Sequence, residues 1–134
     1  MKKTRLINSG ISAVVAGMGH TDTLCIADAG LPIPGDTERI DLALVRGIPS
    51  FRDVLEAVLT ELEVEEITIA EEMEEANPEL YGYLMKRFAG KRVNRVMHAQ
   101  LKLMCSSCKA VVRTGECTSY ANVILHSNVV FSDM

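Results

Sequence analysis

The chain has 134 residues, of which 48% are hydrophobic and 24% charged, and its formal net charge at pH 7 is −4. These values predict one folded domain over residues 1–134 and argue against disorder. The net negative charge and the absence of Trp argue against a nucleic-acid partner. No apolar run reaches the ~20 residues of a membrane span, so we expect no membrane partner, a cytoplasmic location and reduced cysteines.

Helix starts are marked by residues that cap the first backbone N–H groups. Asn8 or Ser9, Ser50 and Asn77 each precede a stretch with helical apolar spacing. Short apolar runs and alternating apolar residues indicate strands. In chain order we expect a helix that ends near Gly17, a strand at 24–27, a loop at 29–38, a strand at 40–44, a helix from Ser50 to about Leu62, a strand at 64–70, a helix from Pro78 to about Phe88, a strand at 93–97, a helix from His98 to about Cys105, and strands at 110–112, 122–125 and 129–131.

Strands that alternate with helices predict an α/β fold. We expect a single three-layer domain in which helices flank a central mixed β-sheet. Polar residues stand at the ends of the predicted strands: His20 before the strand at 24–27, Asp28 after it, and Tyr120 before the strand at 122–125. Because α/β proteins place ligand sites at strand ends, these residues indicate a polar site. From the residues alone, a structural histidine and a turn-capping aspartate are equally good interpretations.

Cys105 and Cys108 have the spacing of a zinc or redox pair. A second paired spacing is missing among the other candidate ligands, and the pair closes a helix instead of opening one. We therefore interpret the pair as ordinary packing, with a metal or redox module as an alternative. The nine glutamates between Glu61 and Glu79 are interpreted as a solvated face, mostly at helix starts and on exposed helix faces. Glu116 is expected to accept backbone hydrogen bonds and not to touch a substrate.

Several separated motifs occur in a fixed order along nearly the whole chain. They are Asn8 with Ile11, the segments 19–22, 28–34, 40–41 and 47–51, His98 with Lys102, and the segments 113–117 and 120–125. With these motifs the chain resembles the D-ribose pyranase family of sugar mutarotases, which also includes L-fucose mutarotase. The Leu31-Pro32-Ile33-Pro34 segment favours the ribose branch of the family.

The resemblance implies an isomerase that interconverts the pyranose and furanose forms of β-D-ribose and needs no metal or redox cofactor. It also implies a homo-oligomer, typically a decamer of stacked pentameric rings. An L-fucose or other monosaccharide mutarotase, and a noncatalytic sugar-binding protein, are the alternatives. The site residues implied by the resemblance are His20 as the proton donor and Asp28, His98, Tyr120, Ala121 and Asn122 as sugar-binding residues.

The chain departs from the family pattern at two places that bear on this site. Ser119 stands where the family usually has proline before the Tyr-Ala-Asn segment, which removes a fixed φ angle. Met97 and Ala99 flank His98, where the family has a small hydroxyl residue and a glutamate. The loss of the hydroxyl residue removes a candidate helix cap.

The separation of His20 from Asp28 carries a further expectation. The eight residue steps from His20 to Asp28 span up to about 26 Å when the segment is fully extended, which is much more than the size of one monosaccharide. Either the chain bends back at both ends of the strand, or two subunits share the site. We favour a site shared at a subunit interface.

Overall fold

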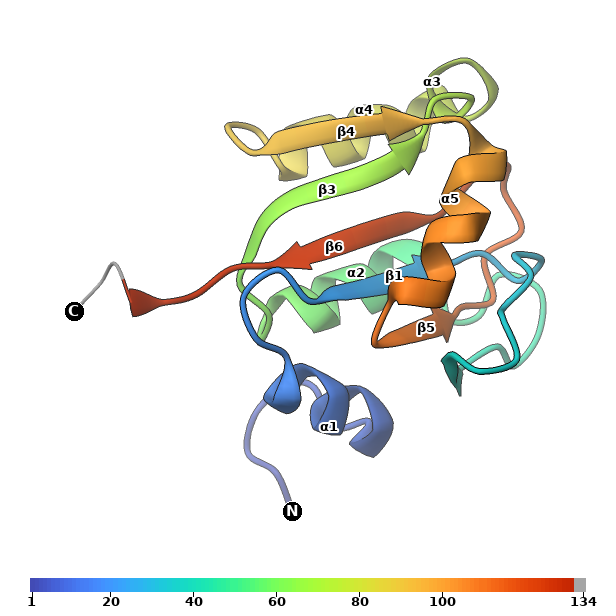
Figure 1. Ribbon diagram of the computed structural model, residues 1–134. Helices are drawn as coiled ribbons and strands as arrows, with labels where there is room; N and C mark the ends of the chain where they lie inside the picture. Colours follow the sequence, from blue (N-terminus) through green and yellow to red (C-terminus); the bar gives the residue numbers. More distant parts are fainter. Residues whose placement is uncertain (132–134) are drawn as a thin grey trace.

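In the computed structural model, which describes residues 1–131, one six-stranded sheet lies between helices on both of its faces (Figure 1). The strand order across the sheet is β2-β5-β1-β6-β3-β4. The elements are α1 (Ser9–Gly17), β1 (Thr23–Ala27), β2 (Glu38–Asp41), α2 (Phe51–Leu59), β3 (Val64–Ala70), α3 (Met73–Ala76), α4 (Pro78–Arg87), β4 (Arg92–Val96), α5 (His98–Met104), the 3-10 turn η1 (Cys105–Ser107), β5 (Ala110–Arg113) and β6 (Val123–Ser127).

Strand direction sets which residues can meet. β1 runs parallel to β5, β5 runs parallel to β2, and β3 runs parallel to β4, whereas β6 is antiparallel to both β1 and β3. Five strands therefore point the same way, and β6 alone runs in the opposite direction (Figure 1). The ends of those five strands and the start of β6 consequently share one edge of the sheet. Their starts and the end of β6 share the opposite edge.

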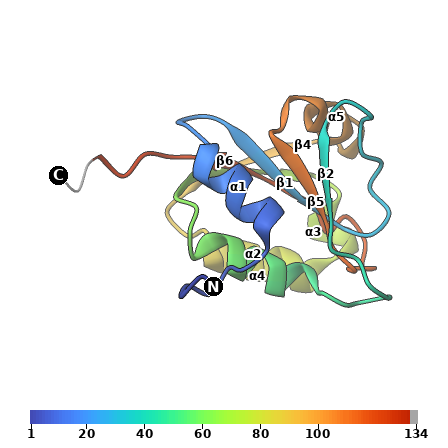
Figure 2. The ribbon, with the colours of Figure 1, turned by 90° about the horizontal axis from the view of Figure 1, so that it is seen from below.

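The two faces of the sheet bury separate cores because side chains alternate along each strand. Leu24 and Ile26 of β1 pack into the core that includes residues of α1, α2 and α4. Cys25 and Ala27 pack into the other core, with Leu101 of α5. Viewed from below, the sheet lies between α5 on one side and α2 and α4 on the other (Figure 2). The expected three-layer α/β fold with a mixed sheet is confirmed.

The helix starts form as their capping residues predict. The side-chain oxygen of Asn8 accepts a hydrogen bond from the backbone N–H of Ile11 at 2.9 Å. Ser50 caps α2 in the same way, with 3.1 Å between its hydroxyl and the N–H of Asp53. Asn77 caps α4, and Pro78 occupies its first turn, where a missing N–H costs no helical hydrogen bond.

Two predicted strands are wrong. The strand expected at 40–44 is β2, Glu38–Asp41, and it ends where a side-chain oxygen of Asp41 accepts a hydrogen bond from the N–H of Ala43 at 3.1 Å. Residues 129–131 form no strand: after β6 the chain leaves the sheet (Figure 1), and the N–H of Val129 donates to the side-chain oxygen of Asn128 at 2.8 Å and not to a partner strand. The short helix α3 was not predicted. Within residues 1–131, no helix combines the length and apolar character needed to cross a bilayer.

Candidate functional site

Asp28 follows the last residue of β1 and is held by Asn122, which precedes β6. The side-chain oxygen of Asn122 accepts the backbone N–H of Asp28 at 2.8 Å, and its Nδ2 donates to Asp28 Oδ2 at 3.1 Å. The other oxygen of Asp28 accepts the N–H of Gly30 at 2.9 Å. Asn122 is fully buried, so in this structure its amide group positions the carboxylate of Asp28 at the edge of the sheet.

His98 and Tyr120 form an aromatic pair at the same edge. Their ring centroids are 5.0 Å apart, in an edge-to-face arrangement. Tyr120 has a φ of 55°, a left-handed conformation that is uncommon for a residue with a side chain and concentrates at functional sites. Nδ1 of His98 is buried without a hydrogen-bond partner among residues 1–131. Since buried polar groups are normally paired, this nitrogen is a natural contact for a ligand hydroxyl.

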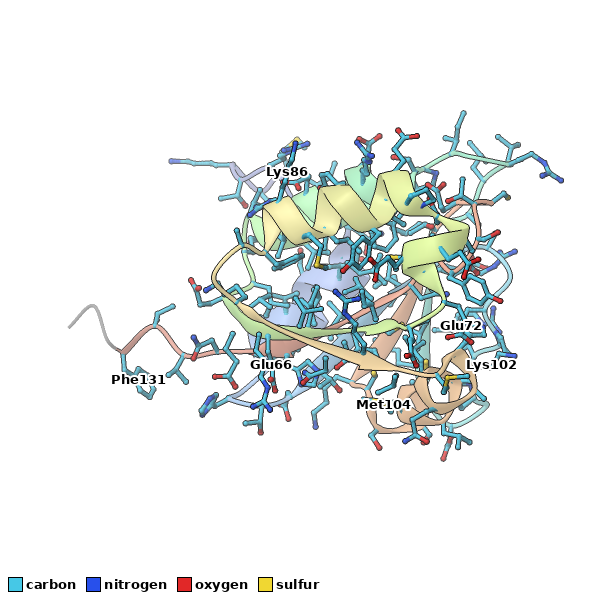
Figure 3. All side chains as sticks on the ribbon, turned by 90° about the horizontal axis from the view of Figure 1, so that it is seen from above. Glu66, Glu72, Lys86, Lys102, Met104 and Phe131 are labelled. Carbon is cyan, nitrogen blue, oxygen red and sulfur yellow. The ribbon has the colours of Figure 1, made fainter. Side chains whose placement is uncertain are left out.

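The position of His98 depends on Glu72. Met97, the residue before α5, provides no side-chain cap. Both carboxylate oxygens of Glu72, which precedes α3, accept the backbone N–H of His98, at 3.0 and 3.2 Å. Glu72 therefore replaces the helix cap that the sequence lacks at Met97. In Figure 3, Glu72 and Lys102 of α5 lie near one end of the sheet, and Glu66 lies farther along β3 toward the other end.

The segment before Tyr120 is held at the starts of two helices, by a backbone N–H of α2 and by the side chain that caps α4. Oε1 of Glu116 accepts the N–H of Phe51 at the start of α2 at 2.9 Å, and Oε2 accepts the hydroxyl of Thr118 at 2.7 Å. The expectation that Glu116 accepts a backbone hydrogen bond is confirmed. Asn77 Nδ2 donates to the carbonyl of Ser119 at 2.9 Å, so the segment is anchored although Ser119 replaces a proline.

Gly115 allows this segment to approach the loop before α2. A Cβ atom at Gly115 would lie 2.4 Å from the carbonyl oxygen of Ile48. The N–H of Gly115 donates to the carbonyl of Pro49 at 2.8 Å, and its own carbonyl accepts the N–H of Gly47. Only a residue without a side chain fits here.

A pocket of about 380 Å³ opens at this edge, lined by residues 28–30 and 116–119. Its volume falls within the range of small-molecule sites, about 300–1,000 Å³. Ala121, between Tyr120 and Asn122, is fully buried in the core, so it anchors this segment and has no surface open to a ligand in a single protomer. The structure thus gathers five of the predicted site residues at the edge formed by the end of β1 and the start of β6, called the Asp28 edge below: Asp28, His98, Tyr120, Ala121 and Asn122.

His20 lies at the opposite edge, called the His20 edge below. It belongs to the turn before β1, in which Thr21 has a φ of 73°. Asp22 Oδ2 accepts the N–H of Gly19 at 2.9 Å, and Thr21 N–H donates to the carbonyl of Ser127 at 3.0 Å. The five residues of β1, at about 3.3 Å each, separate this turn from Asp28 by roughly 16 Å. The chain therefore does not bend back to join His20 and Asp28 within one protomer.

The interpretation of the acidic stretch as mostly helical and solvated is wrong for Glu65 and Glu66. Both lie in β3, and both face histidines. The carboxylate oxygens of Glu65 are each 3.1 Å from Nε2 of His20, and Oε1 of Glu66 is 3.5 Å from Nδ1 of His126. The available signal was their place inside a predicted strand, where two successive charged residues are unusual.

The cysteine pair packs in the core. The Sγ atom of Cys105 donates to the carbonyl of Leu101 at 3.4 Å, and the Sγ atom of Cys108 donates to that of Met104 at 3.7 Å. Burial raises the pKa of Cys108 to about 11. Within residues 1–131, no group of three or more His, Cys, Asp or Glu side chains is arranged to hold a metal ion. These contacts favour the packing interpretation.

An α/β sheet with a polar pocket beside the end of a central strand defines a small-ligand-binding protein. The RbsD / FucU transport protein family matches residues 1–130, and the chain belongs to this family. The D-ribose pyranase of Coprothermobacter proteolyticus is 58% identical over 131 residues, covering 98% of this chain and 100% of that protein. The D-ribose pyranase of Geobacillus kaustophilus is 52% identical, covering 98% of this chain and 97% of that protein.

Solved structures agree with this assignment. The structure of Bacillus subtilis RbsD complexed with D-ribose superposes with a TM-score of 0.95 at 40% identity, covering 98% of this chain and 100% of that chain. The fucose mutarotase of Streptococcus pneumoniae in complex with L-fucose gives a TM-score of 0.78 at 23% identity, covering 94% of this chain and 96% of that chain. This second likeness concerns the fold alone.

Proposed function

We propose that this protein is an isomerase that interconverts the pyranose and furanose forms of β-D-ribose. The observation that carries this proposal is similarity along the whole chain. The protein is 58% identical to a D-ribose pyranase, and its backbone closely follows that of an RbsD structure that binds D-ribose. Identity to the fucose mutarotase structure is 23%, so ribose is the better candidate substrate.

The reaction requires one bond to break and another to form. In the pyranose, a base takes the proton of the anomeric hydroxyl while an acid protonates the ring oxygen, and the bond between that oxygen and the anomeric carbon breaks. The resulting open-chain aldehyde rotates. The hydroxyl on the fourth carbon then attacks the aldehyde carbon, its proton passes to the former acid, and the base returns its proton to the new anomeric oxygen. No atom or electron is gained or lost.

We assign the acid to His20, because the ordinary pKa of histidine, about 6.5, suits proton transfer near neutral pH. Asp28 accepts hydrogen bonds from sugar hydroxyls, and Asn122 fixes the direction of its carboxylate. Nδ1 of His98 and the ring of Tyr120 supply further contacts on the same side, and Ala121 anchors the segment that carries Tyr120 in the core. The base is not assigned.

These roles require two copies of the chain. His20 and Asp28 lie at opposite edges of one protomer, so a single sugar reaches both only if the His20 edge of one subunit meets the Asp28 edge of another. We therefore propose a homo-oligomer with sites at its subunit interfaces, and a decamer of stacked pentameric rings as its form. We also propose a cytoplasmic location for the protein.

Saturation-transfer NMR on equilibrated D-ribose tests the function directly. The protein is expected to accelerate exchange between pyranose and furanose signals, and His20→Ala is expected to abolish the acceleration while its circular dichroism stays that of the wild type. Binding without acceleration would identify a noncatalytic sugar-binding protein. Faster exchange of L-fucose than of D-ribose would assign the protein to the other branch.

A further inference from the structure

The start of β3 contains a bulge at Glu65. Val64 pairs with Ser127 and Glu66 pairs with His126, so two successive residues of β6 face three residues of β3. Glu65 is the extra residue. Bulges occur next to functional sites, where they re-aim a side chain.

The bulge changes which side chains share a face. Without it, Val64 and Glu66 would lie on the same face of the sheet. Instead, Val64 and Ile67 both enter the core that contains α2 and α4. Glu66 turns to the other face, where its carboxylate reaches His126. Glu65 is left to reach the turn that carries His20.

The contact with His20 is specific to one nitrogen. Both oxygens of Glu65 lie 3.1 Å from Nε2 of His20. An ionised carboxylate only accepts hydrogen bonds, so Nε2 carries a proton and donates it. Within the described residues, the structure gives Nδ1 of His20 no hydrogen-bond partner, and 51% of the side chain is exposed.

We propose that Glu65 is the positioning residue of His20 and that Nδ1 is the nitrogen that exchanges a proton with the sugar. This inference rests on the proposed function. Glu65 holds the ring by Nε2, which directs Nδ1 away from β3 toward the neighbouring subunit. When Nδ1 gives its proton to the ring oxygen, the imidazole becomes neutral and Nε2–H stays on Glu65. When the ring recloses, Nδ1 takes the proton of the attacking hydroxyl.

Exchange rates measured over a range of D-ribose concentrations test this role. Glu65→Ala is expected to lower the maximal exchange rate about tenfold or more, below the 100- to 10,000-fold typical of removing an acid itself. The concentration that gives half-maximal exchange stays unchanged, because Glu65 does not touch the sugar. Glu65→Gln keeps the shape of the side chain and an accepting oxygen but removes the charge, so its maximal exchange rate falls less than that of Glu65→Ala. Glu63→Ala is the matched control, since the side chain of Glu63 lies 4.0 Å from Lys91 and not near His20.

Two further measurements separate positioning from a general structural effect. In the His20→Ala background, adding Glu65→Ala is expected to cause no further loss, because residues that act as one unit are non-additive. Formate is expected to restore exchange in Glu65→Ala but not in His20→Ala. If Glu65→Ala and Glu65→Gln exchange ribose at the wild-type rate while His20→Ala is inactive, this inference fails and the proposed function stands. If His20→Ala is fully active, the assignment of His20 itself fails.

Discussion

The two edges of the sheet differ in how their polar residues are held. At the Asp28 edge, side chains from distant segments fix one another: Asn122 holds Asp28, Glu72 holds the start of α5, and Asn77 holds the carbonyl of Ser119. At the His20 edge, a single imidazole projects from a tight turn and contacts one carboxylate. In our proposal, the first edge binds the sugar, and the second provides the acid to a site on a neighbouring subunit.

In our proposal, neither edge alone is a complete active site. The Asp28 edge offers a pocket and a fixed carboxylate but lacks the proposed acid. The His20 edge offers the acid but, in our assignment, no pocket for the sugar. A homo-oligomer that brings the two edges together supplies both. Substitutions at the Asp28 edge should therefore weaken ribose binding, whereas substitutions at the His20 edge should lower the rate of exchange.

Among substitutions of the supporting residues, the largest effect is expected from removing the amide that holds Asp28. Asn122→Ala leaves the N–H of Asp28 and its carboxylate without their buried partner, at a cost of about 1–3 kcal/mol, and the misdirected carboxylate weakens ribose binding. Titration calorimetry with D-ribose and thermal unfolding measure the two losses. The same substitution at Asn94, in the middle of β4, should leave ribose affinity unchanged. Equal affinities for both variants and the wild type would contradict the role given to Asn122.

The next effect concerns the close approach at Gly115. Gly115→Ala places a methyl group 2.4 Å from the carbonyl oxygen of Ile48, and relieving this overlap costs about 1–3 kcal/mol. Gly17→Ala, at the end of α1, meets nothing within 4 Å and should leave stability equal or slightly higher. Denaturant unfolding compares the two. A Gly115→Ala variant as stable as Gly17→Ala would show that the two segments are not packed as described.

A smaller effect is expected at the start of α5. Glu72→Ala removes the cap at His98, which costs about 0.5–2 kcal/mol, and frees the ring of His98 from its orientation against Tyr120. The concentration of ribose for half-maximal exchange should rise, with little change in the maximal rate. Glu75→Ala, an exposed change in α3, is the control. Should both variants behave as the wild type, Glu72 has no part in positioning His98.

The smallest effect is a pH dependence of stability from His126. Burial lowers the pKa of His126, and Glu66 and Glu65 oppose that change only in part. Between the lowered pKa and the ordinary value of about 6.5, the unfolded chain binds more protons than the folded one, so stability rises with pH across this window. His126→Gln should flatten the rise, as measured by thermal unfolding from pH 5 to 8. An unchanged slope would contradict the assignment to His126.

The fold could largely be predicted because its signals are local, whereas the residues of the Asp28 edge were predicted from the resemblance to the family. Asn8, Ser50 and Asn77 mark helix starts by their own capping chemistry, and Asp28 follows an apolar strand. The order of motifs along the chain supplied the family, which the match over residues 1–130 confirms. The assignment of individual residues to catalysis and sugar binding remains a prediction.

The contacts that hold the site could not be predicted because they join distant segments. Asn122 and Asp28 are 94 positions apart, and the cap from Glu72 to His98 spans 26. The bulge at Glu65 depends on how β3 pairs with β6, a strand that is far away in the sequence. The error at 129–131 has a similar cause, since a short apolar run does not reveal whether a partner strand is present.

Mixing two inactive variants tests most directly the claim that His20 and Asp28 act together across subunits. His20→Ala and Asp28→Asn are each expected to be inactive in saturation transfer. The two variants are then unfolded together and refolded at equal concentrations. Because each site takes His20 from one subunit and Asp28 from another, random assembly gives about a quarter of the sites both an intact His20 and an intact Asp28. Exchange should then recover to about a quarter of the wild-type rate. Mixtures that stay inactive while assembling into mixed oligomers would contradict a shared site.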